Sequence, residues 1–181
     1  MKVLVVVDMQ NDFITGSLGT PEAQAIMPNV KNKVREYVKN GDVIIYTRDT
    51  HHPNYLKTRE GKKLPVEHCI YKTEGWQIPE ELLPPFTYEN ASIIDKPTFG
   101  SLQLIDDIER TIDDMGDGDT EIEIVGLCTD ICVVSNALLL KSRFYEYCDI
   151  FVDATCCAGV TPETHEAALK TMEMCQINVK R

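Results

Sequence analysis

Short, strongly apolar runs alternate along the chain with longer stretches in which apolar residues recur every three or four positions. The short runs predict β-strands, and the first is a β-branched stretch of the kind found in strands covered on both faces. The predicted strands span Lys2 to Val7, Asp42 to Thr47, Ala91 to Asp95, Glu121 to Leu127, Tyr147 to Val152 and Ile177 to Val179.

The longer stretches predict helices between the strands. Gly41 is expected to end the first helix, and Pro162 favours the start of the last one, after Thr161 as its cap. The predicted helices are Pro21 to Asn40, a helix with Leu102, Ile105, Ile108, Ile112 and Met115 on one face, a helix from about Thr129 to Phe144, and the helix after Thr161. A polar turn is predicted from Asp113 to Asp119.

This alternation of strand and helix predicts an α/β fold: a doubly wound, Rossmann-like parallel sheet with right-handed crossovers and helices on both faces. No repeat, low-complexity tract or linker interrupts the pattern, so residues 1–181 are expected to form a single domain. The long exception is the stretch from Asp49 to Thr87, which has no clear period, and such segments in compact domains are usually functional.

Composition narrows the classes of function. The net charge of −11 would repel nucleic-acid phosphates, and no apolar run is long enough to span a membrane. Because no signal-peptide pattern is present either, we expect a cytoplasmic protein whose seven cysteines are mostly thiols. None of these cysteines forms a C-x-x-C pair, so a structural zinc knuckle is not expected.

Reactive side chains follow the predicted strands at their carboxyl ends, which is the edge where open α/β sheets bind ligands. In chain order they are Asp8, then Asp49 with His51, then Lys96, and then Cys128 with Cys132. Because the strands are expected to be parallel, these side chains should gather at one edge of the sheet.

Cys132 is the candidate nucleophile in this set. A thiol in the first turn of a helix feels the positive helix end, and the unpaired N–H groups there could hold an oxyanion. Asp8 could take the thiol proton, and Lys96 could stabilise the resulting anion. Free cysteines are most often small buried apolar residues, but the convergence of Asp8 and Lys96 favours catalysis. Cys128 is expected to contribute a backbone N–H donor rather than its thiol.

The second candidate group is a metal site. Asp49 and His51, at positions i and i+2 of an extended segment, point the same way and could bind one ion. Glu60 and His68 lie in the long loop that could bring them there. Mixed carboxylate and imidazole ligation suits zinc, iron or manganese. Loop residues of these types are usually solvated, so spacing alone leaves the metal site open. The solvated histidines are expected to be His52 and His165.

Several motifs, in the same order along the chain, resemble the isochorismatase-like cysteine hydrolases. They are Val5 to Phe13 around Asp8, Lys96 after the third strand, and Gly126 to Val133 around Cys132. Thr47 to His51 and Leu64 to Cys69 are similar to the metal-binding segments of the nicotinamidase (pyrazinamidase) branch. Any one motif alone would be weak evidence, whereas the same order over essentially the whole chain makes the resemblance specific.

The resemblance implies a catalytic triad and an oxyanion site. The triad would consist of Cys132, Asp8 and Lys96. A cis peptide bond is implied between Leu127 and Cys128, which would turn the N–H groups of Cys128 and Cys132 toward the oxyanion.

The resemblance also implies a metal site and a substrate pocket. The metal ligands would be Asp49, His51 and His68, with Glu60 matching a fourth ligand found in some members. In nicotinamidases the metal holds the pyridine nitrogen, and Phe13 would pack near the ring. Leu64 stands where those enzymes often have an aromatic residue, and Phe99 is expected to supply an aromatic wall instead.

We therefore expect an amidohydrolase of nicotinamidase type, with one divalent metal ion, that converts nicotinamide to nicotinate and ammonia through a cysteine thioester in NAD salvage. The expected partners are the small amide and further copies of the chain in a homo-oligomer. One alternative is another small-amide or carbamoyl hydrolase of the same superfamily. A second is a non-catalytic metal-binding or redox module. Isochorismate cleavage is disfavoured, because that branch generally lacks the metal ligands and the cysteine.

Overall fold

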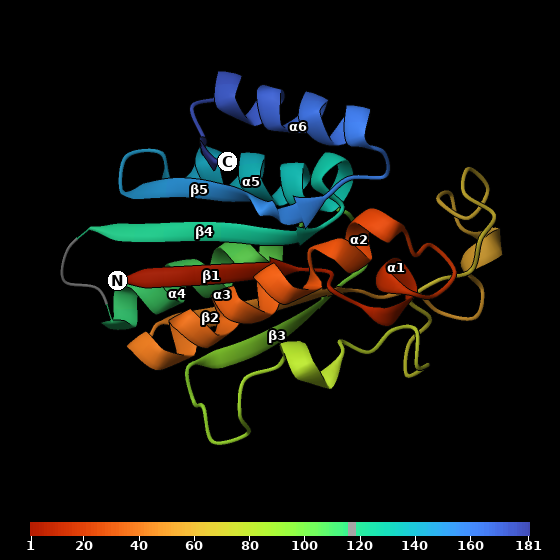
Figure 1. The fold of residues 1–181 in the computed structure, drawn as a ribbon, viewed down its shortest axis with the longest axis horizontal. Helices are drawn as coiled ribbons and strands as arrows, with labels where there is room; N and C mark the ends of the chain where they lie inside the picture. The colour runs from red at the N-terminus through yellow and green to blue at the C-terminus, as the bar shows by residue number, and fades with distance from the viewer. Residues whose placement is uncertain (116–118) are drawn as a thin grey trace.

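A parallel sheet forms the centre of the molecule. The computed structural model describes residues 1–115 and 119–181. Its strands are β1 (Lys2–Val7), β2 (Val43–Asp49), β3 (Ala91–Lys96), β4 (Thr120–Leu127), β5 (Cys148–Ala158) and β6 (Asn178–Lys180). They form one 6-stranded sheet in the order β3-β2-β1-β4-β5-β6, with every pairing parallel (Figure 1). The predicted doubly wound α/β fold is therefore confirmed.

Helices cover both faces of this sheet. They are α1 (Asn11–Ile14), α2 (Pro21–Ala25), α3 (Met27–Asn40), α4 (Leu102–Met115), α5 (Val134–Phe144) and α6 (Pro162–Met174), with single 3₁₀ turns at Tyr55–Lys57 and Glu80–Leu82. Successive side chains of a strand point to opposite faces. Accordingly, Val3 and Val5 of β1 pack with α4, α5 and α6, whereas Leu4 and Val6 pack with α2 and α3.

Two predicted helices differ from the structure, the first because it is divided and the second because it begins later. The stretch from Pro21 to Asn40 is divided at Ile26 into α2 and α3, with Pro28 in the first turn of α3. Proline has no N–H for a preceding carbonyl and is tolerated only where a helix starts, which explains the division. The helix predicted from about Thr129 opens instead with a wider π turn, Thr129–Val133, before α5 begins.

Strand β5 is longer than its apolar pattern suggests. It continues from the predicted end at Val152 to Ala158, and its pairing with β4 shifts register between Ile124 and Gly126. The added residues are polar or small, so they carry no strand-like hydrophobic signal. The turn predicted from Asp113 begins too early, because residues 113–115 belong to helix α4, and residues 116–118 lie outside the described residues.

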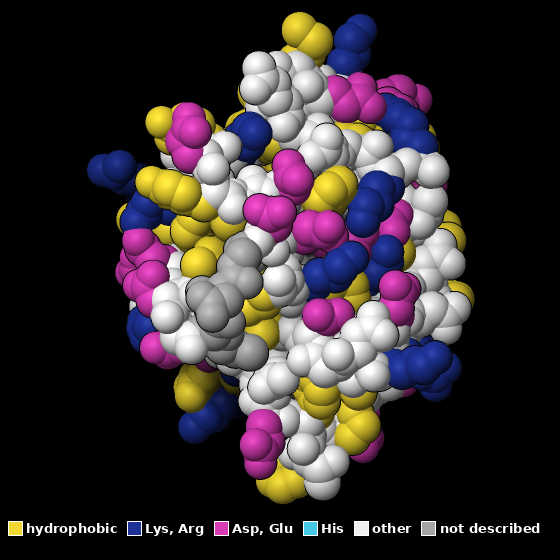
Figure 2. Space-filling model, turned by 90° about the vertical axis from the view of Figure 1, so that its left-hand side faces the viewer, with side chains coloured by type: hydrophobic (Ala, Val, Ile, Leu, Met, Phe, Trp, Pro, Cys, Tyr) yellow, Lys and Arg dark blue, Asp and Glu magenta, His cyan; other side chains and the backbone are white. Residues whose placement is uncertain are grey.

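The amino ends of the strands form a mixed charged face. Figure 2 shows this face with Lys and Arg side chains interspersed among Asp and Glu. One ion pair there joins Lys2 of β1 to Glu121 of β4, at 3.0 Å. Among the described residues, no helix has the length and apolar character needed to cross a membrane. The candidate site lies at the opposite, carboxyl edge.

Candidate active site and metal centre

Asp8, Lys96 and Cys132 meet at the carboxyl edge of the sheet. Asp8 follows β1 directly, with a φ of 47°, a left-handed conformation that Asp adopts more readily than most residues. Lys96 is the last residue of β3, and Cys132 lies in the π turn that follows β4. Strands far apart in sequence therefore deliver the three side chains to one place, as the sequence predicts.

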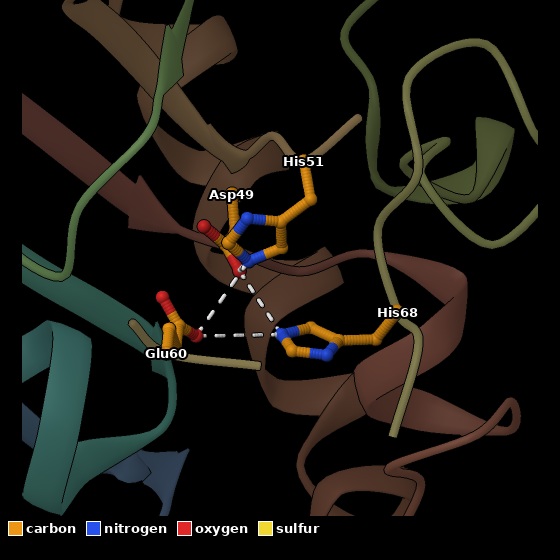
Figure 3. A group of neighbouring side chains, drawn as sticks. All are labelled: Asp49, His51, Glu60 and His68. Atoms are coloured by element: carbon orange, nitrogen blue, oxygen red, sulfur yellow. Dashed lines mark ion pairs between the residues drawn. The ribbon is translucent and has the colours of Figure 1, made fainter. Parts of the chain in front are cut away.

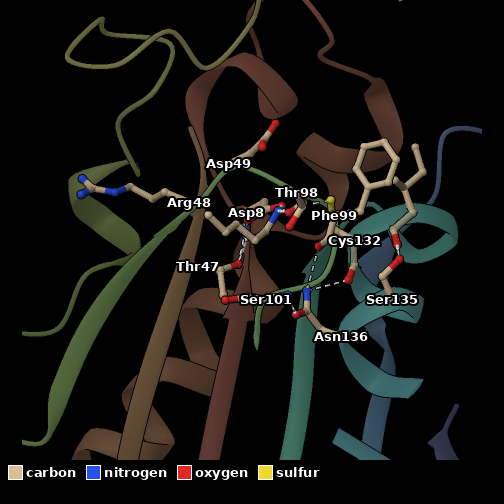
Figure 4. Close-up of polar contacts among 12 residues, drawn as sticks. Asp8, Thr47, Arg48, Asp49, Thr98, Phe99, Ser101, Cys132, Ser135 and Asn136 are labelled. Atoms are coloured by element: carbon tan, nitrogen blue, oxygen red, sulfur yellow. Dashed lines mark hydrogen bonds and ion pairs between the residues drawn. The ribbon is translucent and has the colours of Figure 1, made fainter. Parts of the chain in front are cut away.

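The contacts among these three residues are short and shielded from water. Lys96 Nζ lies 2.6 Å from Asp8 Oδ2 and 3.6 Å from Cys132 Sγ. Thr47 donates a hydrogen bond of 2.7 Å to the other carboxylate oxygen of Asp8 (Figure 4). The exposed fractions of Asp8, Lys96 and Cys132 are 0%, 1% and 6%. At such burial the charges act on one another far more strongly than they would in water.

Burial shapes the protonation of this group. It raises the pKa of Asp8, although the nearby Lys96 ammonium works in the opposite direction. Burial and the charge of Asp8 together raise the pKa of Cys132 well above its ordinary value. For Lys96, burial is outweighed by Asp8 and Cys132, which raise its pKa. These directions favour a neutral thiol beside a charged lysine, with a carboxyl group near them that can exchange a proton.

The backbone before Cys132 has an unusual course. The peptide bond between Leu127 and Cys128 is cis, which confirms that expectation. Gly126 has a φ of +116°, and a Cβ atom there would lie 2.1 Å from the carbonyl oxygen of Val7. Only glycine allows this close approach of β4 to β1 in that conformation. The close approach places the end of β4, just before the Cys132 turn, next to Val7, the residue that precedes Asp8.

Asp49, His51, Glu60 and His68 form a second cluster (Figure 3). Asp49 Oδ2 lies 3.0 Å from His51 Nε2 and 3.4 Å from His68 Nε2. Glu60 Oε1 lies 3.6 Å and 3.9 Å from the same two nitrogens. One candidate ligand atom from each residue lies within 4.8 Å of all the others. The long loop thus brings Glu60 and His68 to the end of β2.

The chemistry of this cluster fits a divalent metal ion. His68 Nδ1 lies 2.8 Å from the carbonyl oxygen of Val66, which can only accept, so Nδ1 carries a proton and Nε2 faces the carboxylates. His51 Nε2 is buried, and among the described residues it makes no hydrogen bond of good geometry, although Asp49 Oδ2 lies 3.0 Å away. Burial opposes a charge on Asp49, but the two histidines hold its pKa below the ordinary value. Two imidazole nitrogens and two carboxylates suit zinc, iron or manganese.

A cavity of about 600 Å³ joins the two clusters. Cys128 and Cys132 line it, and so do three residues of the second cluster, Asp49, Glu60 and His68. The three predicted substrate contacts are all in its wall: Phe13, Leu64 and Phe99. The Phe13 ring also packs against His68, with centroids 5.5 Å apart. A ligand in this cavity would contact both the Cys132 thiol and the second cluster of side chains.

Some residues at the site carry no assigned role in the sequence-based interpretation. Asn136 is fully buried, donates to the Cys132 carbonyl oxygen at 2.8 Å and accepts from Ser101 N at 2.9 Å. The sequence signal that could have revealed Asn136 is a polar residue on the inner face of an apolar helix, one turn after Cys132. His165 is not the solvated residue predicted, because it hydrogen-bonds to Thr129, whereas His52 is exposed as predicted.

Comparisons with known proteins agree with this architecture. A nicotinamidase of Saccharomyces cerevisiae is 25% identical, with 99% of each chain covered. A pyrazinamidase of Pyrococcus horikoshii, solved in complex with zinc, is 28% identical with a TM-score of 0.81, covering 99% of this chain and 98% of that one. The N-carbamoylsarcosine amidase of Thermoplasma acidophilum, 24% identical, shares the fold with a TM-score of 0.78 over 99% and 95% of the chains.

The family comparison covers nearly the full length of the protein. The description "Isochorismatase domain" matches residues 2–180, from the first residue of β1 to the last residue of β6. On this match, the chain belongs to the isochorismatase family.

Proposed function

We propose that this protein is an amidohydrolase of nicotinamidase type, which converts nicotinamide to nicotinate and ammonia. The family match and the named relatives indicate the coarser activity, an amide hydrolase. One observation supports the finer proposal most strongly. The nucleophile candidate Cys132 and three of the metal-cluster residues line the same cavity, so one small amide could contact both at once.

In the proposed reaction, Asp8 takes the proton of the Cys132 thiol, and the sulfur attacks the amide carbon. Lys96, in contact with both side chains, stabilises the negative charge while it moves between them. The carbonyl oxygen, now an oxyanion, accepts hydrogen bonds from the N–H groups of Cys128 and Cys132.

Asp8 then returns its proton to the leaving nitrogen, so that the C–N bond breaks and ammonia departs. A thioester between the acyl group and Cys132 is left. Water attacks the thioester carbon while Asp8 accepts a proton again, and the thiol is restored as the carboxylate product forms. The raised pKa of Asp8 suits a group that both takes and gives this proton.

The proposed metal ligands are Asp49, His51, Glu60 and His68. A divalent ion bound there would supply a Lewis-acid contact for the pyridine nitrogen of the substrate. The cavity wall formed by Phe13, Leu64 and Phe99 would hold the ring between that contact and Cys132. The single domain, the homo-oligomer and the cytoplasmic location stay predictions.

An ammonia-release assay tests the proposal. Nicotinamide, pyrazinamide, a carbamoyl compound and an aliphatic amide are compared with and without a chelator. Nicotinamide and pyrazinamide are expected to be preferred, and chelation is expected to weaken their turnover most. If the aliphatic or carbamoyl substrate is preferred and its turnover does not change with chelator, the hypothesis of a general small-amide hydrolase is favoured. No hydrolysis of any amide, with oxidation at a cysteine pair, would favour a redox module.

A further inference from the structure

A histidine outside the predicted site bonds to the turn that carries Cys132. His165 Nδ1 lies 2.8 Å from the hydroxyl oxygen of Thr129, the first residue of the π turn Thr129–Val133. Thr129 is fully buried. We propose that His165 is a positioning residue for the nucleophile, because its bond to Thr129 fixes the turn that orients Cys132. This inference rests on the proposed role of Cys132.

The position of His165 is itself firmly set. Thr161 caps α6 through a reciprocal pair with Thr164, at 3.1 and 3.2 Å, and His165 N donates to Thr161 O at 2.9 Å. The chain just before the cap packs against the histidine: a Cβ atom on Gly159 would lie 2.9 Å from His165 Cβ. His165 is therefore held in the first turns of α6 while its ring reaches the buried hydroxyl.

A second hydrogen-bonded contact joins the same turn to the segment just before α6. The Asp130 carboxylate accepts from Val160 N, at 3.1 Å to one oxygen and 3.2 Å to the other. Val160 precedes the α6 cap and lines the cavity. Thr129 and Asp130 are successive residues at the start of the turn: the first bonds to α6 itself and the second to the segment that leads into it.

The far end of the turn is held separately. Asn136 donates to the carbonyl oxygen of Cys132 at 2.8 Å. With both ends fixed, the thiol and the N–H groups of the turn have one orientation toward Lys96 and the cavity. Loss of the His165 contact releases Thr129, so that the start of the turn is held through Asp130 with less constraint, which would shift Cys132 relative to its partners.

The fully buried residues of α6 do not include His165. The helix docks through Ala168, Leu169 and Met172, which are buried in the core or packed against it. Replacement of the histidine is therefore expected to leave α6 in place and to disturb the turn locally. This separates a positioning role from a role in holding the fold together.

The test compares five variants with the parent protein: His165→Ala, Thr129→Val, the double variant, His165→Asn and Lys170→Ala. Asn can place an amide group near the position of the histidine Nδ1, so it is the rescue variant. Lys170 is exposed on the same helix and serves as the matched control. The readouts are kcat and KM for nicotinamide, the rate of Cys132 alkylation by iodoacetamide located by mass spectrometry, and thermal unfolding.

His165→Ala and Thr129→Val are each expected to lower kcat and the Cys132 alkylation rate about tenfold, with KM within about twofold of the parent. The double variant should be no worse than either single variant, because both remove one contact. His165→Asn should regain most of the loss, and Lys170→Ala should match the parent.

A folded His165→Ala protein with parental kcat and alkylation rate would overturn the proposal, as would additive losses in the double variant. If Thr129→Val does not fold, the comparison of His165→Ala with His165→Asn decides the question. If the parent does not hydrolyse nicotinamide, the proposed function fails, and the alkylation rates still decide whether His165 positions Cys132.

Discussion

The side chain of Gln10 bonds to both backbone polar groups of Asp49. Gln10 Nε2 donates to the Asp49 carbonyl oxygen at 2.9 Å, and Gln10 Oε1 accepts from Asp49 N at 2.7 Å. A further bond from Nε2 reaches the carbonyl oxygen of Trp76 at 2.9 Å. Gln10 is fully buried, and it lies two residues after Asp8. It therefore fixes the backbone of a proposed metal ligand relative to the proposed general base.

Gln10→Leu is expected to weaken both stability and metal binding. The change keeps similar bulk but leaves the backbone groups of Asp49 buried without partners, which costs about 3 kcal/mol of unfolding free energy. Loss of the support behind a ligand should lower metal affinity about 10- to 100-fold. Urea unfolding and competition with a chromophoric chelator measure the two effects. Unchanged metal affinity in a destabilised Gln10→Leu protein would contradict the positioning argument.

Cys132→Ala is expected to abolish turnover and preserve the fold. Removal of the sulfur removes the atom that carries the thioester, whereas the small change in a buried position is tolerated. Ammonia release and circular dichroism measure the two outcomes. Cys128→Ala is the matched control, since its proposed contribution is a backbone N–H group. Turnover by Cys132→Ala at even a tenth of the parental rate would exclude the mechanism.

Lys96→Met is expected to lower kcat at least about 100-fold and to move the pH dependence of Cys132 alkylation upward. Burial already raises the pKa of Asp8, and the Lys96 charge opposes that rise. Without the charge, the pKa of Asp8 rises further, so the carboxylate that takes the thiol proton forms only at higher pH. Alkylation rates across a pH series test this. An unshifted profile would show that Lys96 does not act on Asp8.

Much of this arrangement follows from the sequence. The strand pattern places Asp8 and Lys96 at one sheet edge, because parallel strands with helical crossovers must end together. The resemblance supplied the pairing of Glu60 and His68 with Asp49, which spacing alone left open. The hydrogen bonds that hold the site residues in place could not be predicted in the same way. The bond from His165 to Thr129 depends on how α6 docks across the turn, and no local periodicity encodes that distance.

Glu123 provides a pH-dependent test of the fold away from the active site. This buried carboxylate of β4 lies 2.8 Å from Lys180 Nζ and 3.2 Å from Lys33 Nζ, and it accepts from Tyr37 at 2.8 Å. Burial alone would raise its pKa, but the bonds from Lys180 and Tyr37 outweigh burial and lower it. Folding therefore favours the charged form of Glu123.

Because the folded pKa lies below the ordinary value of 4.5, the stabilisation from Glu123 is complete above 4.5 and is lost as pH falls through the folded pKa. Glu123→Gln should thus cost about 1 to 2 kcal/mol near neutral pH, since it removes a buried charge that pairs with Lys33 and with the half-exposed Lys180, while Lys33 keeps its ion pair with Asp153. The difference from the parent should shrink in acid. Urea unfolding at several pH values measures it, and a constant difference would contradict this account.

The last prediction concerns the candidate metal-binding residues. His51 Nε2 and His68 Nε2 are both buried and both face the Asp49 and Glu60 carboxylates. A divalent cation would satisfy all of these groups together. Protein purified without chelator is therefore expected to contain close to one zinc, iron or manganese ion per chain by elemental analysis.

His51→Ala should reduce that metal content, whereas His52→Ala, the exposed neighbour, should not. If the metal holds the pyridine nitrogen, its removal should weaken nicotinamide binding strongly and change the rate of Cys132 alkylation much less, because Lys96 contacts Asp8 and the thiol directly and neither Asp8 nor Lys96 is a proposed metal ligand. Calorimetry with the Cys132→Ala protein separates binding from turnover. Metal-free protein that hydrolyses nicotinamide at the full rate would exclude the pyridine contact and favour a more general small-amide hydrolase.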